Sequence, residues 1–209
     1  MKRLVLASGN PGKLREMRAL LAPLALDVVP QDAFELIAQS ALGLSEAEEP
    51  HHTFLENALA KARHASRASG LPALADDSGL CVAALGGEPG VQSAYYAGHE
   101  GDREARDARN NAKLVRALEG RADRRGEYVC VMVLVRHADD PRPIVVEGAW
   151  RGEIVAVPRG ANGFGYDPHF LVESLGRTAA ELDAETKNRL SHRGLAAARL
   201  IERLHEEQD

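Results

Sequence analysis

A glycine-rich turn near the start of the chain has residue types that can bind phosphate. It follows a short apolar run, precedes a segment with helical periodicity, and consists of Ser8, Gly9, Asn10, Pro11, Gly12 and Lys13. Backbone N–H groups at a helix N-terminus can hold an anion, and the lysine adds a positive charge. The motif is not a Walker A loop, because Leu14 follows Lys13 where that loop has Ser or Thr. An ordinary tight turn stays as the alternative interpretation.

Two acidic pairs have the chemistry of a magnesium site. Glu48 and Glu49 precede one predicted helix, and Asp76 and Asp77 end a predicted strand. Carboxylate oxygens suit Mg²⁺, which usually keeps several waters and is shared with substrate phosphates. Because successive side chains of a strand point to opposite faces, we expect only one of Asp76 and Asp77 to face a shared ligand. Helix-capping or turn roles for both pairs are the alternative.

Four further polar residues are candidates only in combination with these groups. Lys61 lies in a helical segment, whereas Lys187, His192 and Arg193 lie near the start of the last predicted helix. Each alone is typical of a solvated surface. The sequence contains neither the HExxH spacing of a zinc protease nor the GxSxG motif of a serine hydrolase, so both classes are disfavoured.

Strands and helices are predicted to alternate in the first half of the chain. The expected strands are residues 3–7, 26–29, 71–75 and an extended continuation over 80–85. The first helix ends near Pro23. A second helix begins after Thr53, because Glu56 stands at the capping-box spacing, and it ends at Gly70.

The second half continues this mixed pattern. Its expected strands are residues 128–135, 144–147 and 154–157, and its expected helices are residues 102–119 and 195–204. The first of these helices carries a stripe predicted to be buried, namely Ala105, Ala108, Ala112, Val115 and Leu118. The order predicts an α/β fold in which polar loops follow the strands, which is where open sheets usually bind ligands.

Length and composition set limits on the class of protein. The 209 residues predict one large domain, or two small lobes without a linker, and 44% hydrophobic residues suffice for a core. A net charge of −5 and only 4% aromatic residues argue against coating of a nucleic acid polymer. Cys81 and Cys130 cannot form a disulfide framework. No signal peptide or membrane span is recognisable, so we expect a cytoplasmic protein without a membrane partner.

Six segments, taken in order, resemble the inosine/xanthosine triphosphate pyrophosphatase family. They are SGNPGK (8–13), TFLENALAKAR (53–63), ADDSGL (75–80), LGGEPG (85–90), GFGYDP (163–168) and SHRG (191–194), so the resemblance spans residues 4 to about 204. It implies a single domain over residues 1–209, with an elongated mixed β-sheet and flanking helices that form two lobes around a central cleft. It also implies a homodimer, Mg²⁺, and hydrolysis of a nucleoside triphosphate to the monophosphate and pyrophosphate by attack at the α-phosphorus.

The resemblance also assigns roles to residues. It implies that Asp77 is the catalytic carboxylate and a metal ligand, that Glu48 is the second metal ligand, and that Lys13 and Lys61 assist catalysis. The implied substrate contacts are the turn residues 8–13 together with Ser78, Phe164, Gly165, Tyr166, Asp167, Lys187, His192 and Arg193. Two departures leave alternatives open. Pro50 and His51 replace Thr-Gly, which leaves Glu48 and Glu49 as alternatives, and Tyr95 stands where the family commonly has arginine, with Arg103 as a candidate replacement.

Specificity in such a site would depend on the six-position of the purine. Donors from His192 or Arg193 would bind the six-carbonyl of inosine or xanthosine but would meet the six-amino group of ATP, leaving buried groups unpaired. Phe164 or Trp150 could stack on the base, or could pack in the core. A pyrophosphatase for another modified nucleotide and a nucleotide-binding regulator without turnover are the alternative functions.

Overall fold

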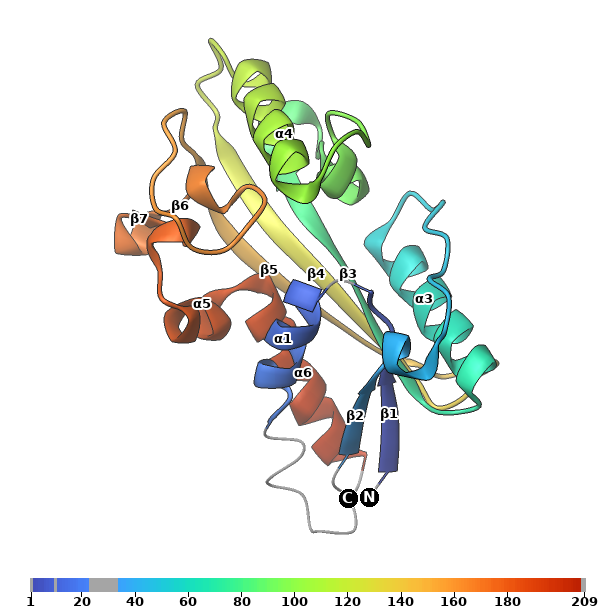
Figure 1. Ribbon diagram of the computed structural model, residues 1–209. Helices are drawn as coiled ribbons and strands as arrows, with labels where there is room; N and C mark the ends of the chain where they lie inside the picture. The colour runs from blue at the N-terminus through green and yellow to red at the C-terminus, as the bar shows by residue number, and fades with distance from the viewer. Residues whose placement is uncertain (1, 10, 23–33, 208–209) are drawn as a thin grey trace. The chain divides into compact units, whose positions relative to one another are not determined.

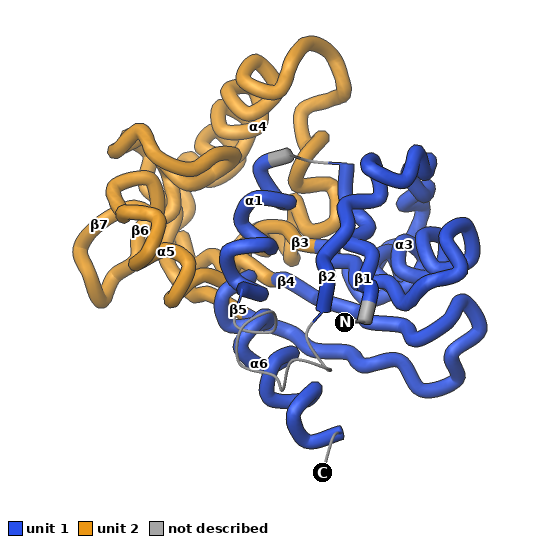
Figure 2. The backbone as a smooth tube through the Cα atoms, turned by 60° about the horizontal axis from the view of Figure 1, so that its bottom comes forward, with its two compact units in different colours: residues 1–77, 130–148, 193–209 blue, residues 78–129, 149–192 orange. Residues whose placement is uncertain are grey.

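The computed structural model describes residues 2–9, 11–22 and 34–207. The chain divides into two compact units (Figure 2). Unit 1 comprises Met1–Asp77, Cys130–Gly148 and Arg193–Asp209, and unit 2 comprises Ser78–Val129 and Ala149–His192. The described strands form one mixed sheet in the order β2-β1-β3-β4-β5-β6-β7. The sheet and its flanking helices confirm the predicted α/β class.

Unit 1 contains the N-terminal strands and helices. Its elements are β1 (Lys2–Leu6), α1 (Pro11–Leu20), β2 (Phe34–Ala38), α3 (Phe54–Ser69) and most of α6 (His192–Glu206), and it shares β3 (Ala73–Val82), β4 (Arg125–Val135) and β5 (Ile144–Ile154) with unit 2. β1 pairs in parallel with both β2 and β3. The predicted strand over residues 26–29 lies outside the described residues.

The strands of unit 1 are covered by helices on both faces (Figure 1). Leu4 and Leu6 of β1 share a buried cluster with Met17 of α1 and Leu200 of α6. Val5 is fully buried and has the opposite parity, so it points to the other face, which α3 covers. β1 therefore sends alternate side chains toward α1 and α6 and toward α3.

The helix α3 forms where its capping residues predict it. The Thr53 hydroxyl accepts a hydrogen bond from the backbone N–H of Glu56 at 3.2 Å and donates one to the Glu56 carboxylate at 2.6 Å. Gly70 ends the helix with φ +69°, a conformation that favours glycine. Its buried face is made largely of small residues, including Ala58, Ala62 and Ala65.

Unit 2 is built around an aromatic core. It contains α4 (Arg103–Ala117), β6 (Phe170–Val172), β7 (Arg177–Thr178) and α5 (Ala184–Leu190). Trp150 and Tyr128 are buried, and both lie against the fully buried Phe170, at ring-centroid distances of 5.2 and 4.6 Å. Of the two interpretations of Trp150, core packing is therefore the one that the structure supports.

The prediction of a buried stripe on α4 was wrong for the three alanines of that stripe. Ala105, Ala108 and Ala112 are exposed, whereas Asn110 and Leu114 are the buried residues of the helix. The Asn110 side chain accepts from the N–H of residue 97 at 2.8 Å and donates to the carbonyl of residue 94 at 3.1 Å. An alanine side chain has little apolar area to bury, so the larger leucine and the hydrogen-bonded asparagine determine which face packs.

Two strands are longer than the periodicity indicated. β3 runs without interruption through the acidic pair to Val82, and β5 extends the strand predicted over 144–147 through Trp150 to Ile154. The separate strand predicted over 154–157 was wrong, because β5 ends at Ile154 and residues 155–157 are irregular or bent. Within the described residues, no helix has both the length and the apolar character needed to cross a membrane.

Candidate active site

Two consecutive aspartates of β3 point to opposite faces of the sheet. Asp76 and Asp77 are both buried, with 4% and 6% of their surfaces exposed. Asp76 has the parity of Leu74, which packs in the cluster formed with α1 and α6. Asp77 instead contacts side chains of α3. The prediction that the pair would separate is confirmed.

Asp77 lies among polar side chains of α3 and the segment before it. Lys61 Nζ lies 3.1 Å from Asp77 Oδ1 and 3.4 Å from Glu49 Oε1, and Asn57 Nδ2 donates to Asp77 Oδ2 at 3.3 Å. Burial raises the pKa of Asp77, and Glu49 raises it further, so that the attraction of Lys61 and Lys13 only partly offsets the shift. Asp77 is thus a more basic carboxylate than an exposed aspartate.

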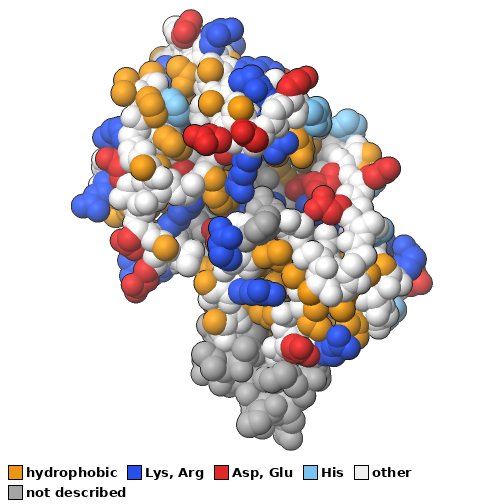
Figure 3. Space-filling view, viewed as in Figure 1, with side chains coloured by type: hydrophobic (Ala, Val, Ile, Leu, Met, Phe, Trp, Pro, Cys, Tyr) orange, Lys and Arg blue, Asp and Glu red, His pale blue; other side chains and the backbone are white. Residues whose placement is uncertain are grey.

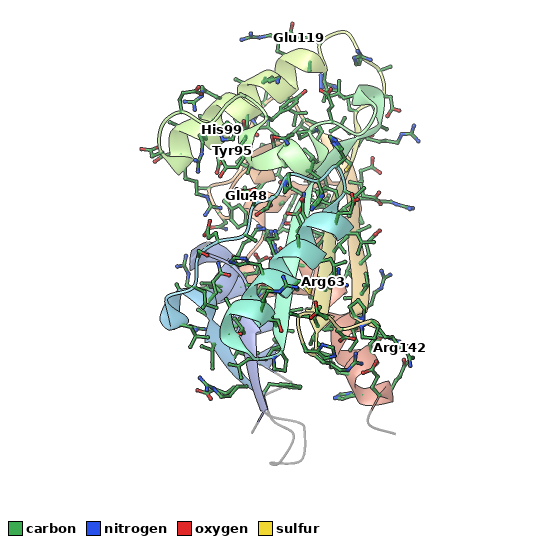
Figure 4. The ribbon with its side chains drawn as sticks, turned by 90° about the vertical axis from the view of Figure 1, so that its right-hand side faces the viewer. Glu48, Arg63, Tyr95, His99, Glu119 and Arg142 are labelled. Carbon is green, nitrogen blue, oxygen red and sulfur yellow. The ribbon has the colours of Figure 1, made fainter. Side chains whose placement is uncertain are left out.

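The same group of residues fits a magnesium ion that is shared with a substrate. No cluster of three or more His, Cys, Asp or Glu side chains suited to a metal occurs among the described residues. Mg²⁺ usually takes only one or two carboxylates from the protein and the rest from water and phosphate. Asp77 and Glu49 both lie within 3.4 Å of Lys61 Nζ and are the two carboxylates that could serve as such ligands. Glu48 (labelled in Figure 4) and Glu49 are both exposed in the segment before α3, but Glu49 Oε1 lies 3.4 Å from Lys61 Nζ, and this contact favours Glu49 as the second ligand.

Asp76 forms a separate buried ion cluster on the other face of β3. Lys13 Nζ and Arg193 Nε lie 3.3 and 3.2 Å from Asp76 Oδ2, and Arg193 Nη1 lies 2.9 Å from Glu16 Oε2. Burial alone would raise the pKa of Asp76, but Lys13, Arg193 and Lys61 lower it far below its ordinary value. Asp76 therefore stays ionised and anchors both cations.

This cluster changes what Arg193 can do. Two of its nitrogens are engaged by carboxylates of unit 1, and only 3% of its surface is exposed. Sequence reasoning missed Glu16, although Glu16 stands three residues after Lys13 and hence on the same side of α1. No local spacing in the sequence predicts that Arg193 binds Asp76, because the two residues are 117 positions apart.

The glycine-rich turn leads into the first turn of α1, as predicted. The helix begins at Pro11, and its first N–H groups have no partner within the helix. Lys13 in that first turn is held by Asp76. Gly9 is exposed, and Ser8 is half-buried. Asn10 lies outside the described residues.

In unit 2, Asp167 organises the predicted nucleoside loop. Its Oδ2 accepts from the backbone N–H of Phe164 at 2.8 Å and lies 2.5 Å from Lys187 Nζ, and its Oδ1 accepts from the Tyr128 hydroxyl at 3.3 Å. Gly163 has φ +77°, and a Cβ there would lie 2.1 Å from Asp167 Oδ2. Glycine is therefore required at position 163.

The remaining predicted residues of unit 2 differ in exposure. Tyr166 is buried, and its hydroxyl donates to the carbonyl of residue 93 at 2.8 Å. The His192 ring is also buried and stacks on Tyr128 at 4.8 Å. Phe164 and Ser78 are half-buried. The structure thus brings Phe164, Asp167 and Lys187 together, and places Tyr166 as a core anchor.

Tyr95 stands where the family commonly has arginine, and Arg103 is the candidate replacement for that arginine. Each of the two contacts the ring of another residue. The Arg103 guanidinium lies 4.4 Å from the centre of the Phe164 ring. Tyr95 stacks on His99 at 4.3 Å, and Arg106 lies 5.1 Å from the Tyr95 ring (Figure 4). These contacts place Arg103 against the predicted nucleoside loop.

The fold and the charged groups define a mixed α/β protein in which two aspartates of a buried strand are paired with basic side chains of the flanking helices. Residues 4–203 match the model of the Ham1 family, and the chain belongs to that family. The predicted family resemblance is thereby confirmed.

Relatives match over almost the whole chain. A dITP/XTP pyrophosphatase of Ralstonia nicotianae is 64% identical over 204 residues, covering 98% of this chain and 97% of the relative. One of Nitrosomonas europaea is 59% identical over 208 residues, covering 100% and 97%. The solved structure of a HAM1 protein from Coxiella burnetii has a TM-score of 0.88 at 46% identity, covering 99% of this chain and 100% of that one.

The buried cluster around Asp76 predicts a large effect on stability. Asp76→Asn removes the charge that compensates Lys13 and Arg193, so we expect a loss of about 3–5 kcal/mol in the free energy of unfolding, measured by urea denaturation. The matched control is Glu35→Gln, which breaks an exposed ion pair with Arg3 and should cost about 0–1 kcal/mol. Equal effects of the two variants would contradict the structural role of Asp76.

Proposed function

We propose that this protein hydrolyses deaminated purine nucleoside triphosphates (ITP, dITP and XTP) to the monophosphate and pyrophosphate, which keeps these nucleotides out of DNA and RNA. The observation that carries the proposal is the buried Asp77 beside Lys61 and Glu49, in the same unit as the glycine-rich turn with Lys13. The name dITP/XTP pyrophosphatase, borne by relatives that match almost the whole chain, supports the substrate class.

In this mechanism Asp77 orients water and accepts its proton. Its raised pKa makes it a better base than an exposed carboxylate. Asn57 holds the second carboxylate oxygen, which fixes the orientation of the group. Lys13 and Lys61 neutralise negative charge on the triphosphate. To do so, each must share or exchange its present carboxylate partners, which are Asp76 for Lys13 and Asp77 with Glu49 for Lys61. Asp77 and Glu49 are the residues that would hold Mg²⁺, which when bound stabilises negative charge on the phosphoryl oxygens.

Residues of unit 2 carry the selection of the base in this proposal. Phe164 offers an aromatic face, and His192 a donor for the six-carbonyl of hypoxanthine or xanthine. The six-amino group of ATP would leave such a donor unpaired in a buried site, which is the basis for rejecting adenine. Because Arg193 already binds Asp76 and Glu16, its contact with the base requires the guanidinium to exchange a partner.

We further propose that the two units act as one catalytic domain in a cytoplasmic homodimer. Apolar side chains are exposed over α4 (Figure 3). They border a groove of about 520 Å³ that is lined by apolar residues such as Ala108 and Ala112 and by polar ones, namely Asn111, Arg116, Glu119 and His169. Val157 beside this groove is 72% exposed and adds an apolar side chain to this surface.

A substrate panel tests the proposed activity. Purified protein with Mg²⁺ is incubated with ITP, XTP, dITP, ATP, GTP and TTP, and the products are separated by chromatography. We expect monophosphate and pyrophosphate from the first three, at a kcat/KM about 10⁴-fold above that for ATP, because a hydrogen-bonding site rejects a mismatched donor by that order. Equal rates on ATP and ITP would exclude base selection, and tight ITP binding without turnover would indicate a regulator.

The role of Asp77 is tested by Asp77→Asn. The amide cannot accept a proton from water, so we expect kcat for ITP to fall by about 10²–10⁴-fold, measured by pyrophosphate release. Circular dichroism and ITP binding by calorimetry serve as controls for folding and for the substrate site. A folded variant with nearly normal kcat would remove Asp77 from the mechanism.

Sedimentation velocity tests the homodimer. The wild-type protein should sediment at twice the 22.5 kDa chain mass. Val157→Asp should shift it toward monomer, because a charge would be buried in the interface. Leu175→Asp, at an apolar position that is 42% exposed, is the matched control and should leave the dimer intact. A monomeric wild-type protein at micromolar concentration would contradict the proposal.

A further inference from the structure

Side chains of α4 hold both backbone polar groups of Gly165, in the middle of the predicted nucleoside loop. The Gly165 N–H donates to Asp107 Oδ2 at 2.9 Å, and its carbonyl accepts from Asn111 Nδ2 at 2.9 Å. Asp107 and Asn111 are one helical turn apart, so they project from the same side of α4. Two side chains of α4 therefore hold the backbone both before and after the Cα atom of Gly165.

A third residue of the same helix face extends the contact to the neighbouring side chain. Arg103 stands one turn before Asp107, its Nε lies 3.9 Å from Asp107 Oδ2, and its guanidinium lies 4.4 Å from the centre of the Phe164 ring. Consecutive loop residues are thus fixed by side chains at positions i, i+4 and i+8 of one helix. The family resemblance gives Asp107 and Asn111 no role in binding or catalysis. It names Arg103 only as a candidate replacement for an arginine near the phosphates.

The loop needs such support because its own conformation is costly. Gly163 and Gly165 have φ of +77° and +64°, and glycine loses more conformational entropy on ordering than any other residue. A second tether, in which Asp167 binds Lys187 and the Phe164 N–H, ties the start of the loop to its end but does not bind the backbone polar groups of Gly165. Contacts that order a binding loop before the ligand arrives increase affinity, because the loop has then already lost its conformational entropy and this loss does not oppose binding.

We propose that Asp107 and Asn111 are positioning residues that hold the 163–167 loop in the conformation that binds the nucleoside. The inference rests on the proposed nucleotide function of this loop. The two residues touch no reacting atom, so their loss weakens the binding of substrate and leaves the chemical step intact. Asp107→Ala removes the acceptor, whereas Asp107→Asn retains a side-chain oxygen that can accept from the Gly165 N–H.

Hydrogen exchange tests the positioning of the loop without any activity measurement. In the free protein, peptides covering residues 163–167 should exchange about tenfold faster in Asp107→Ala, since a hydrogen bond to a charged group is lost there. Peptides from α3 should be unchanged, and Asp107→Asn should restore most of the protection. Unchanged exchange of the loop in Asp107→Ala would overturn the inference, even if the protein hydrolyses ITP as proposed.

Steady-state kinetics with ITP test the consequence for substrate. We expect KM to rise about tenfold in Asp107→Ala and in Asn111→Ala with kcat within about twofold of wild type, and Asp107→Asn to restore KM. Glu104→Ala, an exposed acidic residue one turn earlier on α4, is the matched control and should leave both constants unchanged. A fall in kcat at constant KM, or an equal effect of Glu104→Ala, would overturn the positioning role. Failure of the wild-type protein to hydrolyse ITP would instead refute the proposed function.

Discussion

The site in unit 1 depends on two consecutive buried carboxylates on one strand. β3 sends Asp76 and Asp77 to opposite faces of the sheet, and a buried carboxylate is stable only when a cation or several hydrogen-bond donors accompany it. Each face must therefore supply its own cation. Lys13 and Arg193 do so for Asp76, and Lys61 does so for Asp77. These pairs tie α1, α6 and α3 to one short stretch of β3.

The same geometry gives the two aspartates different acid–base properties. Asp76 has cations from two helices within 3.3 Å, and its pKa lies far below the ordinary value, so it remains an anion and organises its surroundings. Asp77 has one lysine, an amide donor and a nearby glutamate, and burial raises its pKa. The environment of each carboxylate, rather than its residue type, therefore determines its pKa and its role.

The sequence was informative where the cause of a structure is local. Strand alternation separated Asp76 from Asp77, and the capping box placed the start of α3 at Thr53. It was misleading on α4, because an alanine stripe has the helical period but too little area to decide which face packs. The partnership of Asp76 with Arg193 joins residues 117 positions apart, and no local spacing encodes it.

The most direct test of the central claim, that water attacks the α-phosphorus, is isotopic. The wild-type protein is allowed to hydrolyse ITP with Mg²⁺ in water enriched in ¹⁸O, and the label is located by mass spectrometry after a single turnover. Attack at the α-phosphorus places one ¹⁸O atom in the inosine monophosphate and none in the pyrophosphate. Label found in the pyrophosphate, with unlabelled monophosphate, would show attack at the β-phosphorus and would contradict the mechanism.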